Sequence, residues 1–343
     1  MLGPMRVVDT HTHFIPIELI ELLRRGEGPP DLSLAEREGQ DPLIAHSGGL
    51  RYPVFPVFHD AETKLEQMDR DGIDVSVISL SPTLLLYGSE PWETARVHRV
   101  INDAAAGLAR AGGGRLRAMA TVPLNDPAAA AAELRRACTE LGLPGVEIGT
   151  TVEEKMLDDP SLDLFYAVAE ELEVPIFVHP YLNMTSPPDA ALAGFHLSNV
   201  IGNPTETFVA AARMIVGGVF DRYPGLRVQL VHAGGGLPYQ LGRLEHAYQA
   251  RSETKVTAKQ RPLSYLRNFL FDTVTYDRRA LRFLIELVGP DRVLFGTDVP
   301  FDMADLSGLD IAQWAEPEIA AKVLGENALE IYRVRTSAGS AVV

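Results

Sequence analysis

The chain has 343 residues, 46% of them hydrophobic, which is enough to bury the core of one large domain. Its 31 Lys and Arg against 46 Asp and Glu give a formal charge of −15, which argues against sequence-independent binding to nucleic acid or anionic membranes. The single cysteine, Cys138, is typical of a reducing cytoplasm, and no apolar run approaches the ~20 residues of a membrane helix. Strand-like sequence also starts too early to leave room for a secretion signal. We therefore expect a cytoplasmic protein with small-molecule chemistry.

Short apolar runs alternate with longer stretches of helical pattern along the whole chain. Eight such runs lie at residues 6–9, 75–80, 117–122, 145–148, 175–179, 227–232, 269–274 and 293–298. This alternation is typical of βα units that form a buried parallel sheet. Eight units in a chain of this length favour a closed (β/α)8 TIM barrel over an open doubly wound sheet.

The segments between the runs predict the helices of these units. Residues 60–71 start at Asp60, a capping residue, place Leu65 and Met68 at helical spacing, and stop at Gly72. The other predicted helices span residues 91–111, 126–141, 161–173, 205–223, 278–287 and 317–332.

Two connections are too long for plain barrel turns, namely residues 26–59 after the first strand and 181–203 after the fifth. We expect both insertions to cover the active site, the first as a lid. The domain prediction is a single barrel over residues 1–335. Residues 336–343, which are small and polar or weakly apolar, are expected to form a disordered tail.

Ionisable residues stand at the ends of several predicted strands. The first strand runs into Val-Asp-Thr-His-Thr-His, and the two-residue period of a strand puts His11 and His13 on one side. His179, His232 and Asp298 end three later strands. In a barrel these ends face the same mouth, so the side chains can converge on one zinc-like divalent ion and leave a position open for water or substrate.

A single His-x-His pair occurs by chance, and a histidine or aspartate at a strand end often only caps the next helix. Five such residues at the ends of separately predicted strands of one barrel make coincidence a strained explanation. The pattern therefore favours a metal centre.

The same residues carry a family resemblance, in the motifs at residues 8–13, 142–150, 177–180, 217–220, 232–236 and 295–301. From about residue 5 to 333 the sequence resembles the metal-dependent amidohydrolase superfamily, in its aminocarboxymuconate-semialdehyde decarboxylase-like branch. The resemblance implies one divalent metal ion, most simply Zn²⁺, and no organic cofactor. Its implied ligands are His11, His13, His179 and Asp298, with His232 as the catalytic histidine and Asp298 beside it. The implied reaction is non-oxidative decarboxylation of a small conjugated or aromatic carboxylic acid.

The resemblance also implies substrate contacts and a homodimer. In the family, arginines after the sixth strand bind substrate carboxylate in the neighbouring subunit's site, and the matching residues here are Arg243 and Arg251. Helix-surface arginines paired with Glu245 or Glu253 are the alternative. The family's other carboxylate-binding arginine falls at Tyr52, which makes its neighbour Arg51 a candidate. Where the family has a tryptophan in the loop after the fifth strand, the candidate polar contacts are His196 and Asn199.

Two other functions stay open at this point. A hydrolase or hydratase would use the same metal site to attack a lactone, an amide or a double bond, because this fold hosts all of these reactions. An inactive metal-binding barrel that serves as a protein partner is the third possibility. The complete set of ligands and the presence of His232 argue against it.

Overall fold

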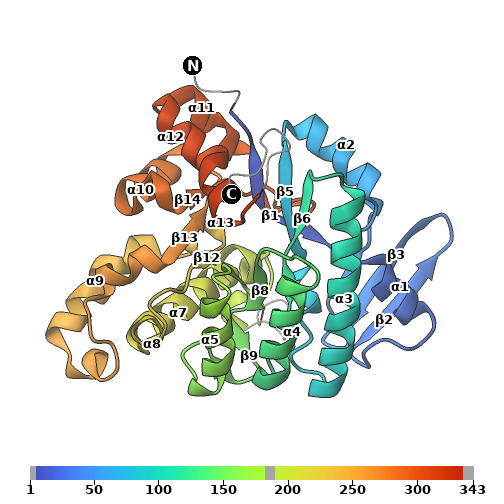
Figure 1. The fold of residues 1–343 in the computed structure, drawn as a ribbon, viewed down its shortest axis with the longest axis horizontal. Coiled ribbons are helices and arrows are strands. Elements are labelled where there is room, and N and C mark those ends of the chain that lie inside the picture. Colours follow the sequence, from blue (N-terminus) through green and yellow to red (C-terminus); the bar gives the residue numbers. More distant parts are fainter. Residues whose placement is uncertain (1–4, 182–189, 335–343) are drawn as a thin grey trace.

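The computed structural model describes residues 5–181 and 190–334, and its centre is a barrel of parallel strands (Figure 1). In chain order the barrel strands are β1 (Val8–Phe14), β5 (Val75–Leu80), β6 (Leu116–Ala118) continued by β7 (Ala120–Thr121), β8 (Val146–Gly149), β11 (Ile176–His179), β12 (Val228–Leu230), β13 (Phe269–Asp272) and β14 (Val293–Leu294). The eight predicted strands are therefore confirmed, with shifted ends. The first begins later and runs through both histidines to Phe14.

Hydrogen bonds at two seams join a three-stranded and a six-stranded sheet into one ring. At the first seam the Met119 N–H donates to the Ile78 carbonyl at 2.8 Å, and the Ala120 N–H donates to the Gly145 carbonyl at 2.8 Å. The strand thus changes partner at Met119. At the other seam the Thr10 N–H donates to the Phe295 carbonyl at 2.9 Å, and the Asp298 N–H donates to the His11 carbonyl at 2.7 Å.

Helices cover the outside of this ring (Figure 1). They are α1 (Ile17–Arg24), α2 (Ala61–Asp71), α3 (Pro91–Ala111), α4 (Pro127–Thr139), α5 (Asp163–Glu171), α7 (Asn203–Val216), α8 (Val219–Arg222), α9 (Leu237–Ala250), α10 (Arg278–Val288), α11 (Ile311–Trp314), α12 (Pro317–Ala321) and α13 (Asn327–Ile331). Helix α2 starts and stops as predicted, because the Asp60 carboxylate accepts from the Thr63 N–H and Gly72 is left-handed, with φ 73°.

One predicted helix is interrupted in the structure, and another contains a local change of helix type. The helix predicted over residues 205–223 breaks into α7 and α8 at Gly217 and at Gly218, whose φ of 71° lies outside the right-handed helical region. The helix predicted over residues 317–332 has a π-helical turn, Lys322–Glu326, between α12 and α13. The first prediction was wrong in continuity, whereas the second is confirmed as one helical stretch with a local π-helical turn.

The insertion after β1 folds into a small sheet of its own, which the sequence pattern did not predict. Its strands β2 (Leu32–Arg37), β3 (Gln40–His46) and β4 (Arg51–Pro53) are antiparallel. A second hairpin, β9 (Thr151–Val152) with β10 (Lys155–Met156), follows β8. The predicted disordered tail at residues 336–343 lies outside the described residues, and the single-domain division stays a prediction.

Strand alternation separates two apolar clusters and directs the site residues. Ile176 and Val178 of β11 belong to the larger cluster, whereas Phe177 belongs to a smaller one together with Val77 and Leu270. His179 shares the strand face of Phe177, so its side chain points to the same side as that smaller cluster. Within the described ranges, no helix has the length and hydropathy that a membrane crossing needs.

Candidate metal centre and active site

Four residues predicted as metal ligands come together at the carboxyl ends of the barrel strands. One ligand atom from each of His11, His13, His179 and Asp298 lies within 4.8 Å of the others, and all four residues are buried. A register shift between Asp9 and Thr12 in β1 accompanies the two histidines of the first strand. The four side chains therefore converge as predicted.

The outer ring nitrogen of each histidine faces an oxygen atom that fixes the ring. His11 Nδ1 lies 2.7 Å from Asp272 Oδ2, and His179 Nδ1 lies 2.9 Å from the Pro180 carbonyl. His13 Nδ1 lies 3.2 Å from the Leu80 carbonyl. Each Nδ1–H can donate to its neighbour, which leaves Nε2 as the nitrogen with a free lone pair.

The Nε2 atoms face the carboxylate of Asp298. Its Oδ1 lies 3.1 Å from His13 Nε2 and 3.3 Å from His11 Nε2. Among the described residues, the buried Nε2 atoms of His11 and His179 have no hydrogen-bond partner. Buried nitrogens without a partner are costly, and a bound cation would satisfy them.

The electrostatics of the cluster also favour a cation. Burial lowers the pKa of His13 and brings the pKa of His179 well below its usual value. Burial also lowers the pKa of His11, but the charge of Asp298 and the hydrogen bond to Asp272 outweigh it and raise this pKa to about 10. For Asp298, burial raises the pKa, yet His11 and the surrounding hydrogen bonds hold it well below its usual range. An ionised carboxylate among imidazoles attracts positive charge, from a proton or a metal ion.

The donor set is three imidazole nitrogens and one carboxylate oxygen, which suits zinc, manganese and similar divalent ions. Orphaned Nε2 atoms and oriented outer nitrogens are the features expected of such a site. The residues present therefore fit a divalent metal ion.

His232 stands beside this cluster, in a turn and not at the end of a strand as predicted. Strand β12 ends at Leu230, and the turn His232–Gly234 holds His232 at φ 53° and Ala233 at φ 55°. His232 Nε2 lies 3.6 Å from Asp298 Oδ2, and its ring centroid lies 5.4 Å from that of His179. The strained turn therefore presents the imidazole to the metal cluster.

One buried carboxylate that the motif reasoning missed connects the metal cluster to this turn. Asp272, the last residue of β13, contacts His11 Nδ1 and accepts hydrogen bonds from the His232 N–H at 2.9 Å and the Ala233 N–H at 2.7 Å. It thereby fixes a ligand ring and the left-handed turn at once. The sequence predicts this strand over residues 269–274, so Asp272 lies inside the predicted strand and only the observed end of β13 brings it to the barrel mouth.

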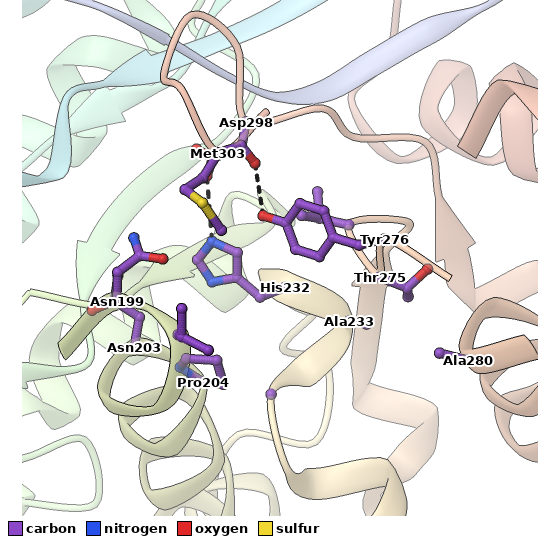
Figure 2. Close-up of a pocket in the computed structure, with 13 residues that line it drawn as sticks. Asn199, Asn203, Pro204, His232, Ala233, Thr275, Tyr276, Ala280, Asp298 and Met303 are labelled. Atoms are coloured by element: carbon purple, nitrogen blue, oxygen red, sulfur yellow. Dashed lines mark hydrogen bonds and ion pairs between the residues drawn. The ribbon is translucent and has the colours of Figure 1, made fainter. Parts of the chain in front are cut away.

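Two cavities of about 350 and 250 Å³ meet at this point and form two lobes of one site. Figure 2 shows His232 in the middle of the first lobe, with Asn199, Asn203 and Pro204 on one side and Tyr276 on the other. The side chains common to both lobes are Asn199, Asn203, His232, Asp298 and Met303. A small ring-sized molecule fits this space next to the metal cluster.

Of the residues predicted to contact the substrate from the two insertions, some line the cavity and one does not. His196 and Asn199 line the second lobe. Tyr52 lines it too, and its hydroxyl lies 2.6 Å from Thr83 Oγ1, whereas Arg51 is exposed and is not among the lining residues. Arg51, His196 and Asn199 stay predictions as substrate contacts.

Arg243 and Arg251 lie on and just after α9, at the periphery of the chain (Figure 1). Both are exposed, and Arg251 pairs with Glu253, the partner that the surface alternative named. Neither lines the two lobes. A role in a partner's site therefore stays a prediction.

Comparison with known proteins gives the family. Residues 8–334 match the family model described as amidohydrolase. The chain belongs to this family. It is 32% identical over 327 residues to 2-amino-3-carboxymuconate-6-semialdehyde decarboxylase of Dictyostelium discoideum, which covers 94% of this chain and 90% of the relative.

Solved structures agree. The apo structure of IDCase from Metarhizium anisopliae is 27% identical, with a TM-score of 0.82 over 96% of this chain and 98% of that chain. A 5-carboxyvanillate decarboxylase from Novosphingobium aromaticivorans, complexed with manganese and 4-hydroxy-3-methoxy-5-nitrobenzoic acid, is 25% identical, with a TM-score of 0.79 over 96% of each chain. The predicted barrel fold and superfamily are confirmed. The named relatives are decarboxylases, which confirms the expected class of carboxy-lyase. The manganese-bound neighbour and the His/Asp cluster together support a divalent metal site.

Proposed function

We propose that this protein is a metal-dependent, non-oxidative decarboxylase of a small aromatic or conjugated carboxylic acid. One observation carries the proposal: His232 lines both lobes of the cavity and faces Asp298 of the metal cluster. An acid–base group is thus placed where a substrate bound next to the cluster would have to lie. The activities named for the relatives point the same way.

The chain's own residues perform the proton and charge steps. His11, His13, His179 and Asp298 would hold a divalent ion, which would act as a Lewis acid toward a substrate oxygen. His232, oriented by Asp298 at 3.6 Å, holds a proton at Nε2 and delivers it to the carbon that carries the carboxylate. The new C–H bond takes its electron pair from the conjugated π system of the substrate. The carbon–carbon bond then breaks, its electron pair restores the π system, and the carboxylate leaves as carbon dioxide. Substrate plus one proton thus gives product plus carbon dioxide.

The test is a screen of hydroxylated benzoates and muconate-like acids with metal-loaded protein in water labelled with ¹⁸O. We expect carbon dioxide in equal amount to a product that has lost only the carboxyl group. A product that carries ¹⁸O, with no carbon dioxide formed, would favour the hydrolase or hydratase instead. Protein with His232→Ala is the matched control, because it keeps the predicted ligands.

We also propose Zn²⁺ as the resident ion, a homodimer as the assembly and the cytoplasm as the location. The imidazole-rich donor set supports zinc, although it also suits manganese. The single cysteine supports a reducing compartment. Elemental analysis of purified protein should find close to one zinc per chain, and light scattering should give the mass of two chains. Manganese in place of zinc would correct the ion and leave the site assignment standing.

A further inference from the structure

The side chain of Asn203 is a buried amide whose oxygen, Oδ1, has no hydrogen-bond partner among the described residues. Asn203 is 4% exposed and lines both lobes of the cavity. Buried polar atoms are nearly always paired, so an unpaired one that lines a binding cavity indicates a group that the ligand satisfies.

The local helix geometry directs this amide into the cavity. The π-helical turn Ser198–Gly202 leads directly into α7, which begins at Asn203. Asn199 and Asn203 are four residues apart and line both lobes, as expected for neighbours on one helical face. Single π-helical turns are frequent at functional sites, where they redirect side chains.

Tight packing keeps Asn203 beside the catalytic turn. Gly235, at φ 58°, lies close to Pro204, the residue that follows Asn203. A Cβ added at Gly235 would stand 2.0 Å from the Pro204 carbonyl oxygen. The Thr207 hydroxyl donates to the Asn203 carbonyl at 3.2 Å from within α7. Figure 2 shows Asn203 and Pro204 next to His232. The segment that carries Asn203 and Pro204 therefore has little room to move, and its amide cannot easily reach a protein partner.

The other residues that line the two lobes indicate which substituent of the substrate would contact the Asn203 amide. On the second lobe the hydroxyls of Tyr52, Thr83 and Ser81 are uncharged, with Tyr52 2.6 Å from Thr83 Oγ1. Asp302 also lines this lobe, and no Lys or Arg is among the described residues that line either lobe. A second carboxylate on the substrate would meet Asp302 without a compensating cation from this chain.

We propose that Asn203 is a substrate-binding residue that recognises an uncharged polar substituent, a hydroxyl or carbonyl group, on a monocarboxylate substrate. The inference rests on the proposed function for the carboxylate and adds the substituent. An amide both donates and accepts, so it pairs with either group and leaves a bare ring with an unsatisfied buried neighbour. Asn203 thereby selects among ring acids.

The experiment is a calorimetric titration of metal-loaded protein with 2,6-dihydroxybenzoate and with benzoate, which differ only in the hydroxyl groups. We expect Asn203→Leu, which has the same branching but is apolar, to reduce the preference for the hydroxylated ligand by at least about tenfold. Thr207→Val is the matched control, because it removes a hydrogen bond to the backbone carbonyl of Asn203 and leaves the Asn203 amide in place. It should leave the preference unchanged.

An equal loss of affinity for both ligands in Asn203→Leu, or the same change in Thr207→Val, would show a structural role and overturn the inference. Asn203→Ala, which adds no bulk, repeats the measurement if the leucine variant does not fold. Titration also separates the two proposals. A preference that depends on Asn203 without any carbon dioxide release refutes the decarboxylase alone, whereas decarboxylation with an unchanged preference refutes only the role of Asn203.

Discussion

The metal cluster and the arginines of the α9 region were both predicted as parts of the active site, but they differ in burial and in their contacts. His11, His13, His179 and Asp298 are buried, and each histidine ring has a second contact that fixes it. Arg251 has a side chain 68% exposed and contacts its own neighbour Glu253. The cluster is complete within one chain, whereas the arginines have a function in catalysis only if a second chain lies against α9. The comparison shows that the role of a residue can be assigned from a single chain only when contacts within that chain hold its side chain in the site.

The largest effect is expected from the loss of a ligand. His13→Ala or Asp298→Ala should lose the metal and the activity together, because either change leaves an incomplete coordination shell. The fall in activity should exceed that of any other variant described below. Elemental analysis and carbon dioxide release measure the two properties on the same sample. His246→Ala, which removes an exposed histidine of α9, is the control. A ligand variant with full metal content and activity would refute the cluster.

His232→Ala should retain the metal and lose turnover by about 10²–10⁴-fold, the usual contribution of a general acid or base. The reason is that His232 faces Asp298 without belonging to the cluster of ligand atoms. Stoichiometric metal with low kcat is the expected result. Loss of the metal instead would mean that His232 is a ligand.

Asp272→Asn should lower metal affinity or activity by about 10–100-fold, the usual effect of removing a partner of a ligating histidine. The amide keeps the size of the carboxylate but cannot accept from His11 and from both backbone N–H groups of the turn in the same way. Asp305→Asn is a close control, because Asp305 is also buried and accepts backbone N–H groups, from Thr275 and Tyr276. Equal metal affinity in Asp272→Asn and wild type would remove Asp272 from the site.

The smallest expected effect, and the most specific one, is the activity regained in mixed dimers of Arg251→Ala and His232→Ala chains. If Arg251 completes the partner's site, one of the two sites in each mixed dimer combines an intact His232 with an intact Arg251 and regains activity. In a site built from one chain, mixing restores nothing. Each parent must first be folded, metal-loaded and inactive alone. A monomer in light scattering, or mixed dimers no more active than the parents, would reject a shared site.

Much of the site was predictable because parallel barrel strands end at one mouth. That rule places His11, His179 and Asp298 together whatever the exact strand ends are, so the late start of β1 did no harm. Asp272 was missed because the strand predicted over residues 269–274 extends two residues past it, whereas β13 ends at Asp272. Asn203 could not be found this way, because it begins helix α7 and does not end a strand.

The fold was predictable to a similar degree. Apolar runs gave the eight strands, because the strands are buried on both faces. The β2–β3 hairpin had one local signal, Gly39 at φ 67° between Arg37 and Gln40, but its strands mix polar with apolar residues and are mostly only partly buried. The break at Gly217 and Gly218 had a local signal as well, since two consecutive glycines weaken a helix, but the helix predicted over residues 205–223 ran through them.

The close approach of Gly235 to Pro204 limits which residues around the cavity can be changed in protein engineering. Any side chain at residue 235 would push apart the segments that carry His232 and Asn203, so directed evolution has little freedom on that side. The second lobe is also lined by Leu50 and Tyr52, and Tyr52 belongs to a small antiparallel sheet outside the barrel ring. Exchanging this sheet as a cassette offers a way to change the accepted acid while the catalytic half of the enzyme stays intact.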